Sequence, residues 1–289
     1  MTVPPVNVNL GDWSKPAKVL VKRVSDAVGG IAKPWQIRRV ARAEADASLI
    51  KATADLAVTE QQRRSISRFV REESQKQENI EDVTAKALPH VQDDSRPEDI
   101  EEDWITHFFD RCRLTSDKEM QELWARILAG EANSPGAFSK RTVNLVATLD
   151  KEEAAAFTKL CGFAWDVKGL TPLIYDAHEA LHQNASLSFS VLNHLTTIGL
   201  ISHSVLSGFE QENVASPFVI RYFDRSALID FPSGRERTFP LGQVMFTQAG
   251  YQLARVCEPE PVPGIYEQAL AHWSDLGFVV ASPYPRGET

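Results

Sequence analysis

The chain has 289 residues, of which 43% are hydrophobic and 24% are charged, and its formal net charge is -8. This composition is that of an ordinary globular protein and excludes the collagen-like, disulfide-scaffold and wholly disordered classes. No apolar run approaches the roughly 20 residues of a membrane span, and the first residues lack the basic start and apolar core of a secretory signal, so the sequence predicts a cytoplasmic protein.

The charge is distributed unevenly along the chain. Residues 1–92 contain 15 Lys and Arg against 11 Asp and Glu, whereas the remainder contains 16 against 28. An acidic surface repels nucleic acid, because neutralisation of phosphates supplies much of the binding affinity. Nucleic-acid binding therefore requires a local basic patch, and Arg38, Arg39 and Arg42 are the candidates for a contact that is independent of base sequence.

Residues 14–32 predict a short amphipathic helix, because apolar residues recur at steps of three and four. Lys18, Lys22 and Arg23 occupy other positions, and Trp13 stands at its start. One interpretation is a helix that lies on an anionic membrane surface, peripheral to the inner membrane, with these four residues as the contact surface. The other, which is commoner among amphipathic helices of soluble folds, is a helix packed on the rest of the protein.

Residues 35–88 contain neither Gly nor Pro, which predicts one long helix or two helices with a bend. A narrow apolar stripe follows this stretch at alternating steps of three and four, through Ala45, Leu49, Ala52 and Leu56 and then Ile66 and Val70, and it is interrupted at Thr59 and Arg63. So thin a stripe is typical of a coiled-coil seam and favours a homo-oligomer. The alternative is an intramolecular hairpin against the next helices.

An acidic stretch after Pro89 separates this arm from a helical bundle. Pro97 fits a first helical position, with several acids on the positive end of the helix dipole. Capping boxes are predicted at Ser116 with Glu119 and at Asp150 with Glu153, and Ser139 opens another helix. The sequence therefore predicts a bundle of short helices joined by tight turns.

The C-terminal third changes character. A helix is predicted from Thr171 or Pro172 to about Gln183, and a second from Leu187 or Ser188 to Ile198. Strand-like segments follow at residues 200–204, 217–223, 227–231 and 243–246, and Thr247 caps another helix. Two helices, a strand and a hairpin describe a winged helix. The tail adds one helix and an apolar edge strand.

The sharpest catalytic motif is His178-Glu179-Ala180-Leu181-His182. On a helix, His178 and His182 would lie one turn apart and could share a zinc ion, with Glu179 as the base for a bound water. No third ligand has an obvious place, so a metal-free histidine pair is favoured over a zinc-dependent hydrolase. No phosphate-binding loop, dinucleotide fingerprint or nucleophile elbow is present, and Cys112, Cys161 and Cys257 indicate reduced core residues, so no cofactor is predicted.

The winged-helix interpretation raises the alternative of a DNA-binding regulator. The helix that would enter the major groove has the sequence LSFSVLNHLTTI, and no Lys or Arg occurs between Gly169 and Ile220. Sequence-specific DNA-binding proteins place cationic and amide side chains on that helix, and this helix contains only Asn193 and His194 as candidates. The module is therefore expected to contact protein or to complete the core, and not to bind a specific nucleic acid.

Two stretches carry a resemblance to known families. KQENIEDVTAKALPHV and RPEDIEEDWITHFFDRCRLTSDKEMQELWARILAGEANSPGAFSKRTVNLVATLDKEEAAAF resemble a bacterial family described only as a domain of unknown function. The short LWARILAGE segment is similar to the alpha family of abortive-infection proteins, which act in phage defence. Neither resemblance implies a catalytic residue; together they imply a bacterial cytoplasmic protein with a role in antiviral defence.

Together these patterns predict a mainly α protein. Its predicted parts are a basic helical arm over residues 1–92, a helical bundle over 93–168, a winged-helix-like α+β module over 169–258 and a C-terminal helix and tail over 259–289. The predicted function is that of a non-enzymatic interaction protein that self-associates and recognises a protein partner or a membrane surface. A DNA-binding regulator and a zinc hydrolase are the alternatives.

Overall fold

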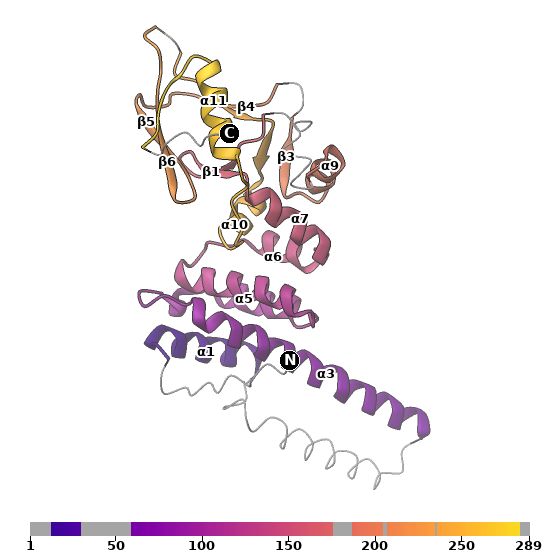
Figure 1. Cartoon of the computed structure of the whole chain (residues 1–289). Helices are drawn as coiled ribbons and strands as arrows, with labels where there is room; N and C mark the ends of the chain where they lie inside the picture. Colours follow the sequence, from indigo (N-terminus) through magenta and orange to yellow (C-terminus); the bar gives the residue numbers. More distant parts are fainter. Residues whose placement is uncertain (1–12, 30–58, 176–186, 205–206, 235, 284–289) are drawn as a thin grey trace, which may run out of the picture. The chain divides into compact units, whose positions relative to one another are not determined.

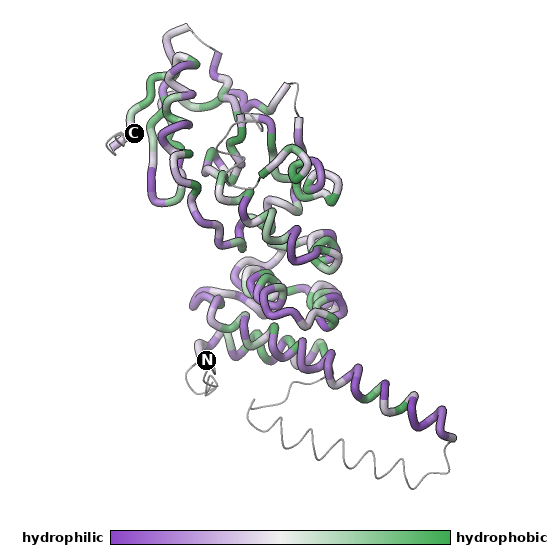
Figure 2. The backbone as a smooth tube through the Cα atoms, turned by 45° about the vertical axis from the view of Figure 1, so that its right-hand side comes forward, coloured by the Kyte–Doolittle hydropathy of each residue, from purple (hydrophilic) through white to green (hydrophobic). Residues whose placement is uncertain are grey.

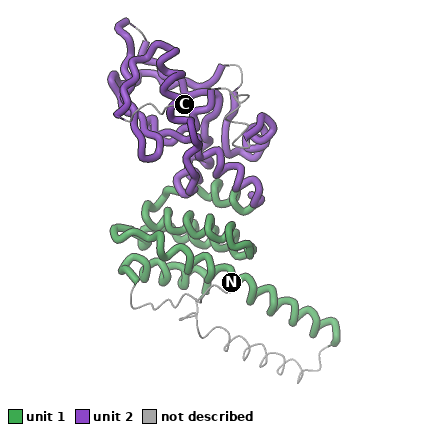
Figure 3. The backbone as a smooth tube through the Cα atoms, in the orientation of Figure 1, with its two compact units in different colours: residues 1–147 green, residues 148–289 purple. Residues whose placement is uncertain are grey.

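The computed structural model describes residues 13–29, 59–175, 187–204, 207–234 and 236–283. The chain divides into two compact units, residues 1–147 and residues 148–289 (Figures 1 and 3). The described part of unit 1 is helical, and unit 2 combines helices with antiparallel strands, so the fold is a mixed α+β fold rich in helix. None of the described helices has both the length and the apolar sequence that crossing a membrane requires.

Unit 1 is a helical bundle with two short 3₁₀ turns. Its elements are α1 (Lys15–Val28), α3 (Glu60–Ala87), η2 (Leu88–His90), η3 (Pro97–Asp99), α4 (Glu102–Cys112), α5 (Lys118–Asn133) and α6 (Lys140–Ala147). Helix α3 packs against α5, and α4 contacts α1, α3 and α6. The boundary predicted at residue 92 therefore falls inside unit 1, because α3 and α5 share one core across it.

The helix starts in unit 1 follow from local capping chemistry. The hydroxyl of Ser14 accepts from the N–H of Ala17 at 3.3 Å and begins α1. The cap predicted at Ser116 is wrong by one residue, because the Asp117 carboxylate accepts from two N–H groups at the start of α5 at 2.9 and 3.0 Å. A carboxylate at that position satisfies two backbone donors, whereas the Ser116 hydroxyl bonds the buried Asn79.

Aromatic side chains fill the core of unit 1. The ring of Phe108 stacks on Trp104 with centroids 5.1 Å apart and meets Trp124 edge-on at 5.2 Å. The indole N–H of Trp104 donates to the carbonyl of Phe138 at 2.6 Å. Ile105, Phe108, Phe109 and Cys112 form the apolar face of α4 and are buried. Helix α4 is thus the centre of the bundle.

Unit 2 contains four helices and nine strands within its described residues. The helices are α7 (Lys151–Cys161), α9 (Phe189–Thr197), α10 (Gln248–Ala254) and α11 (Ile265–Asp275). The strands are β1 (Ala164–Asp166), β2 (Leu170–Pro172), β3 (Ile201–His203), β4 (Phe209–Gln211), β5 (Phe218–Tyr222), β6 (Arg225–Asp230), β7 (Phe239–Gly242), β8 (Val244–Phe246) and β9 (Val279–Ala281).

The largest sheet has the strand order β2-β1-β5-β6-β9, and every neighbouring pair is antiparallel. Two further antiparallel pairs, β3 with β8 and β4 with β7, form separate two-stranded sheets. Along β5 the burial alternates, with Phe218, Ile220 and Tyr222 buried and the residues between them exposed. One face of the large sheet is therefore buried, and side chains of its other face reach solvent.

The buried face of this sheet carries an aromatic cluster. The ring of Trp165 lies 4.8 Å from Tyr222 on β5 and 5.6 and 5.1 Å from Tyr266 and Trp273 on α11, centroid to centroid. The hydroxyl of Tyr266 donates to the carbonyl of Ser226 at 2.6 Å, which fastens α11 to the sheet. Aromatic packing of this kind fixes the position of α11 against the strands.

Most predicted elements of unit 2 are confirmed. Strands β3, β5, β6 and β8, helices α9, α10 and α11, the edge strand β9 and the capping box at Asp150 with Glu153 lie where the sequence predicts them. The helix predicted from Thr171 is wrong at its start, because residues 170–172 form β2 and pair with β1. That hairpin spans the boundary predicted between residues 168 and 169, and most of the predicted helix lies outside the described residues.

Candidate functional site

The N-terminal half of α3 is the most exposed regular element of unit 1. Figure 1 shows this half extending beyond the other described helices of the unit. The helix begins at Thr59 in a capping box: its hydroxyl accepts from the N–H of Gln62 at 3.3 Å, and the Gln62 side chain accepts from the N–H of Thr59 at 2.9 Å. The start of the helix is therefore held by its own capping box.

Three apolar side chains on this half form a stripe that we call the α3 stripe: Ile66, Phe69 and Val70. Residues 66, 69 and 70 share one helix face, since they are three and four positions apart. Phe69 is 63% exposed, and Ile66 and Val70 are half-buried. Figure 2 shows a few short hydrophobic spots on this otherwise hydrophilic half of α3. Phe69 and the two half-buried β-branched residues beside it form one small contiguous apolar patch, which makes the α3 stripe a candidate interaction surface.

The stripe is flanked by charges of both signs. Arg63 pairs with Glu60 at 3.8 Å and Arg68 with Glu72 at 3.6 Å, all four side chains being largely exposed. Exposed pairs of this kind contribute little stability, about 0.3–0.5 kcal/mol each, and can exchange partners. The Lys76 ammonium lowers the pKa of the Glu73 carboxyl by donating a hydrogen bond to it. The surface therefore carries both cations and anions for a partner.

The C-terminal half of α3 is anchored in the bundle. Val83 and Ala87 are fully buried. The side-chain amide of Asn79 donates to the carbonyl of Arg113 at 2.8 Å, and that of Gln121 donates to the Asn79 oxygen at 3.3 Å. Because one continuous helix is buried at one end and exposed at the other, the bundle holds the α3 stripe in a fixed orientation.

The predicted membrane surface on α1 is partly buried. Leu20 and Val24 on its apolar face are 0% exposed, and α1 contacts α4 and η3. The Arg23 guanidinium donates to the carbonyl of Ile100. Lys18 and Lys22 are exposed and Trp13 is half-buried. The structure thus brings Arg23 into the bundle and leaves two lysines at the surface, while the apolar face of the helix is occupied by protein.

Two sets of predicted site residues lie outside the described residues: His178, Glu179 and His182 of the zinc motif, and Arg38, Arg39 and Arg42 of the basic patch. Within the described ranges, no three potential metal ligands of the His, Cys, Asp and Glu types lie together.

Helix α9 presents few groups for DNA. Asn193 is exposed, and the His194 ring nitrogen lies 2.6 Å from a Glu153 carboxylate oxygen on α7. The pKa of Glu153 is lowered, first by the hydrogen bond from the Asp150 N–H and second by His194. Of the two residues that could contact DNA bases, His194 is therefore already paired with Glu153 inside unit 2.

Sequence reasoning placed Ile66 and Val70 on the stripe but missed Phe69. The signal was available, because Phe69 stands three residues after Ile66 and next to Val70. The Phe69 side chain makes the α3 stripe wider than the single line of apolar positions that the sequence spacing predicts.

One family model matches residues 63–270, a range that runs through both units, and the family is described as a protein of unknown function, DUF2806. Comparison with curated proteins and with solved structures finds no match.

Proposed function

The chain belongs to the DUF2806 family, and because the description of that family assigns no activity, we propose a function from the chain's own surface. The protein is a non-enzymatic interaction protein that self-associates through the N-terminal half of α3. The observation that carries this proposal is the α3 stripe, with its 63% exposed Phe69 on a helix whose other end is fixed in a core.

The occupant of the α3 stripe is a second copy of this chain. Two features support this choice. In the sequence, Ala45, Leu49, Ala52 and Leu56 have the same alternating spacing as Ile66 and Val70, with an interruption at Thr59 and Arg63, and such spacing is typical of helices that pair with each other. Exposed arginines and glutamates alternate beside it, so two copies of one surface can supply both members of each ion pair.

The test is the mass of the full-length protein in solution by light scattering. Phe69→Glu places a charge in the seam and is expected to lower the mass from that of an oligomer to that of a monomer, because burying an unpaired charge is costly. Ser67→Glu introduces the same charge at an exposed position of the same helix and serves as the matched control. Circular dichroism checks that both variants retain their helix.

The proposal fails if the wild-type protein is a monomer at all concentrations, or if Phe69→Glu leaves the mass of an oligomer unchanged. A point substitution is preferable to deletion of residues 1–92. That deletion would remove α1 and the buried end of α3 from the core of unit 1 and would unfold the unit under test.

The C-terminal module serves protein recognition in this proposal. Helix α9 is followed by β3, which pairs with β8, as in a winged helix, whereas the β5–β6 hairpin belongs to the large sheet. The absence of Lys and Arg on α9 argues against a DNA groove as the target of this module. Membrane association gains little from α1, since its apolar face packs on α4 and η3. The likeness of the LWARILAGE segment to abortive-infection proteins suggests phage defence as the setting.

A further inference from the structure

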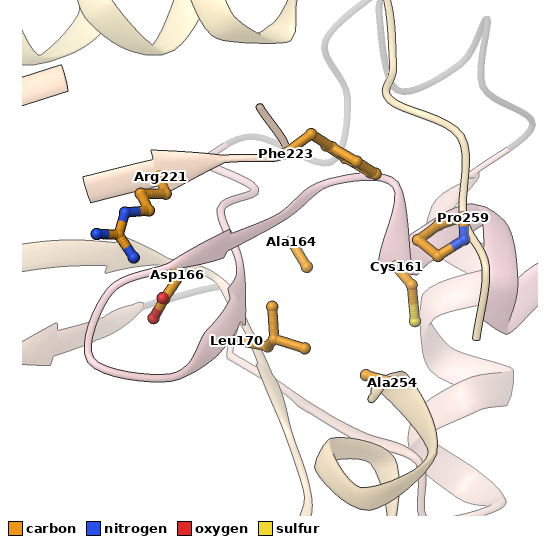
Figure 4. A pocket seen from close by; sticks show the side chains of 8 residues that line it. All are labelled: Cys161, Ala164, Asp166, Leu170, Arg221, Phe223, Ala254 and Pro259. Carbon is orange, nitrogen blue, oxygen red and sulfur yellow. The ribbon is translucent and has the colours of Figure 1, made fainter. Parts of the chain in front are cut away.

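Unit 2 contains a cavity of about 290 Å³ at one end of the exposed face of the large sheet. Figure 4 shows its lining, which comes from three distant parts of the chain: the end of α7 with the β1–β2 hairpin, the end of β5, and the segment from α10 to Pro259. A volume near 300 Å³ is at the lower end of the range for ligand pockets, so the cavity suits a small ligand.

Most of the lining is apolar. Leu170, Phe223, Ala254 and Pro259 contribute hydrocarbon surface, and Cys161 lies at the same end as Ala254 and Pro259 (Figure 4). Burial, and contact with Cys257, raise the pKa of the Cys161 thiol well above its ordinary value. The thiol is therefore neutral and acts as part of the apolar wall.

The opposite end of the cavity carries one cation and one anion. Asp166 on β1 and Arg221 on β5 are directly opposite each other in the antiparallel register, and Figure 4 shows both side chains at the same end. Side chains at such positions lie close together. Both residues are exposed to solvent, and among the described residues the structure shows no ion pair between them and no acceptor for the Arg221 guanidinium, so both charged groups are accessible to a ligand. The Asp166 carboxylate accepts one hydrogen bond, from the N–H of Gly169 at 2.9 Å.

Phe223 forms one wall of the cavity. It is the first residue of the two-residue turn between β5 and β6, and its φ of 51° is the positive φ that such a hairpin turn requires. The residue is 42% exposed, so part of its ring is accessible to a ligand.

We infer that this cavity binds the zwitterion of an apolar α-amino acid. Its carboxylate accepts two hydrogen bonds from the Arg221 guanidinium, its ammonium donates to Asp166, and its side chain lies against Leu170 and Phe223. This arrangement satisfies both charges of the site at once, whereas a simple anion would leave Asp166 beside it and a simple cation would meet Arg221.

The test is calorimetric titration of the full-length protein with L-phenylalanine. We expect saturable binding, several-fold weaker binding of L-alanine, and loss of binding for phenylalaninamide and N-acetylphenylalanine, which each lack one of the two charges. Arg221→Gln and Asp166→Asn should each weaken binding about tenfold or more, because each removes a charge-assisted contact. Arg237→Gln, an exposed arginine of the same unit outside the cavity, is the matched control and should bind as the wild type does.

Three results would overturn the inference: no binding of L-phenylalanine at millimolar concentration, equal binding of the amide or the acetylated form, or unchanged affinity in Arg221→Gln. Circular dichroism of the two charge variants verifies folding. Since the cavity lies in unit 2 and the α3 stripe in unit 1, the outcome is independent of the self-association test.

Discussion

Glu131 is a buried carboxylate that closes the end of α5. Its side-chain oxygens accept from the N–H groups of Gly136 at 2.7 Å and Phe138 at 2.9 Å, and the residue is 2% exposed. Burial raises the pKa of Glu131 above its ordinary value of 4.5, and the two backbone hydrogen bonds oppose that rise. The carboxylate thus holds the turn after α5 in place of backbone partners.

Replacing Glu131 by Ala should lower the free energy of unfolding of unit 1 by about 2–3 kcal/mol, because two buried N–H groups lose their acceptor. Chemical denaturation followed by circular dichroism measures the change. Glu102→Ala, which removes an exposed carboxylate of α4, is the control and should change stability by less than about 0.5 kcal/mol. Equal effects of the two substitutions would mean that Glu131 does not hold the turn.

The sign of the pH dependence at Glu131 follows from its raised pKa. The folded state binds the proton more tightly than the unfolded state, so the contribution of this group to stability is greatest below pH 4.5 and falls as pH rises through the folded pKa. In Glu131→Gln, which does not titrate, this decline should be absent. The difference between the unfolding free energies of wild type and Glu131→Gln should therefore shrink from acid to neutral pH.

The pH dependence of stability expected from Glu153 has the opposite sign. Its pKa is lowered by the hydrogen bond from the Asp150 N–H and by His194. The stability that it contributes is present above the unfolded pKa of 4.5 and is lost as pH falls through the folded value. Glu153→Gln keeps a side-chain oxygen that can accept the Asp150 N–H, as Gln62 does for Thr59, but it removes the negative charge at the start of α7. It should therefore destabilise unit 2 by about 0.3–1 kcal/mol at pH 7, the usual effect of a charge at a helix start, and by much less in acid. Urea unfolding at the two pH values tests this, and an equal loss at both would contradict it.

At the scale of elements, α10 approaches β3 so closely that only glycine fits between them. A Cβ atom on Gly250 would lie 1.9 Å from the carbonyl oxygen of Leu200. The contact is held by Thr247, whose N–H donates to the same carbonyl at 3.1 Å and whose hydroxyl accepts from the N–H of Gly250 at 3.1 Å. The start of α10 therefore packs directly against the backbone at Leu200, just before β3.

Gly250→Ala should destabilise unit 2 by about 3 kcal/mol, the upper range for overpacking, because the neighbour is backbone and cannot rotate away. Gln248→Ala, at an exposed position two residues earlier on α10, should have little effect on stability. Thermal unfolding of the two variants measures the difference. A stable Gly250→Ala protein would show that α10 can move away from β3.

Elements that depend on local chemistry could be predicted from the sequence, and elements that depend on distant partners could not. The capping box at Asp150 and the Thr247 cap identify helix starts from a few neighbouring residues. Strands β1 and β2 are three residues each, and Pro172 suggested a helix start instead. Their strand character comes from pairing with each other and from the contact of β1 with β5, which follows about fifty residues later.

The same distinction applies to the candidate sites. Ile66 and Val70 were predicted because the residues of a helical stripe lie three or four positions apart within one segment of the sequence. The cavity was not, because Asp166, Arg221 and Pro259 lie in three separate segments that only the fold brings together. Nothing in the spacing of those residues indicates that they share a site.

At the scale of the whole molecule, the two units divide the proposed roles. Unit 1 holds one end of α3 in its core and leaves Phe69 exposed at the other end, where we propose self-association. Unit 2 supplies the sheet, the cavity and the α9 surface. The family match, residues 63–270, covers parts of both units.

The most direct measurement of self-association is photo-crosslinking from position 69. A photoreactive phenylalanine analogue replaces Phe69 in the full-length protein, and a mixture of isotopically light and heavy chains is irradiated. Mass spectrometry then separates links within one chain from links between two. The account predicts light-to-heavy links that join position 69 to residues 60–72 of a second copy. Links formed only within one chain, for example to residues 30–58, would contradict it and assign the α3 stripe to an intramolecular contact.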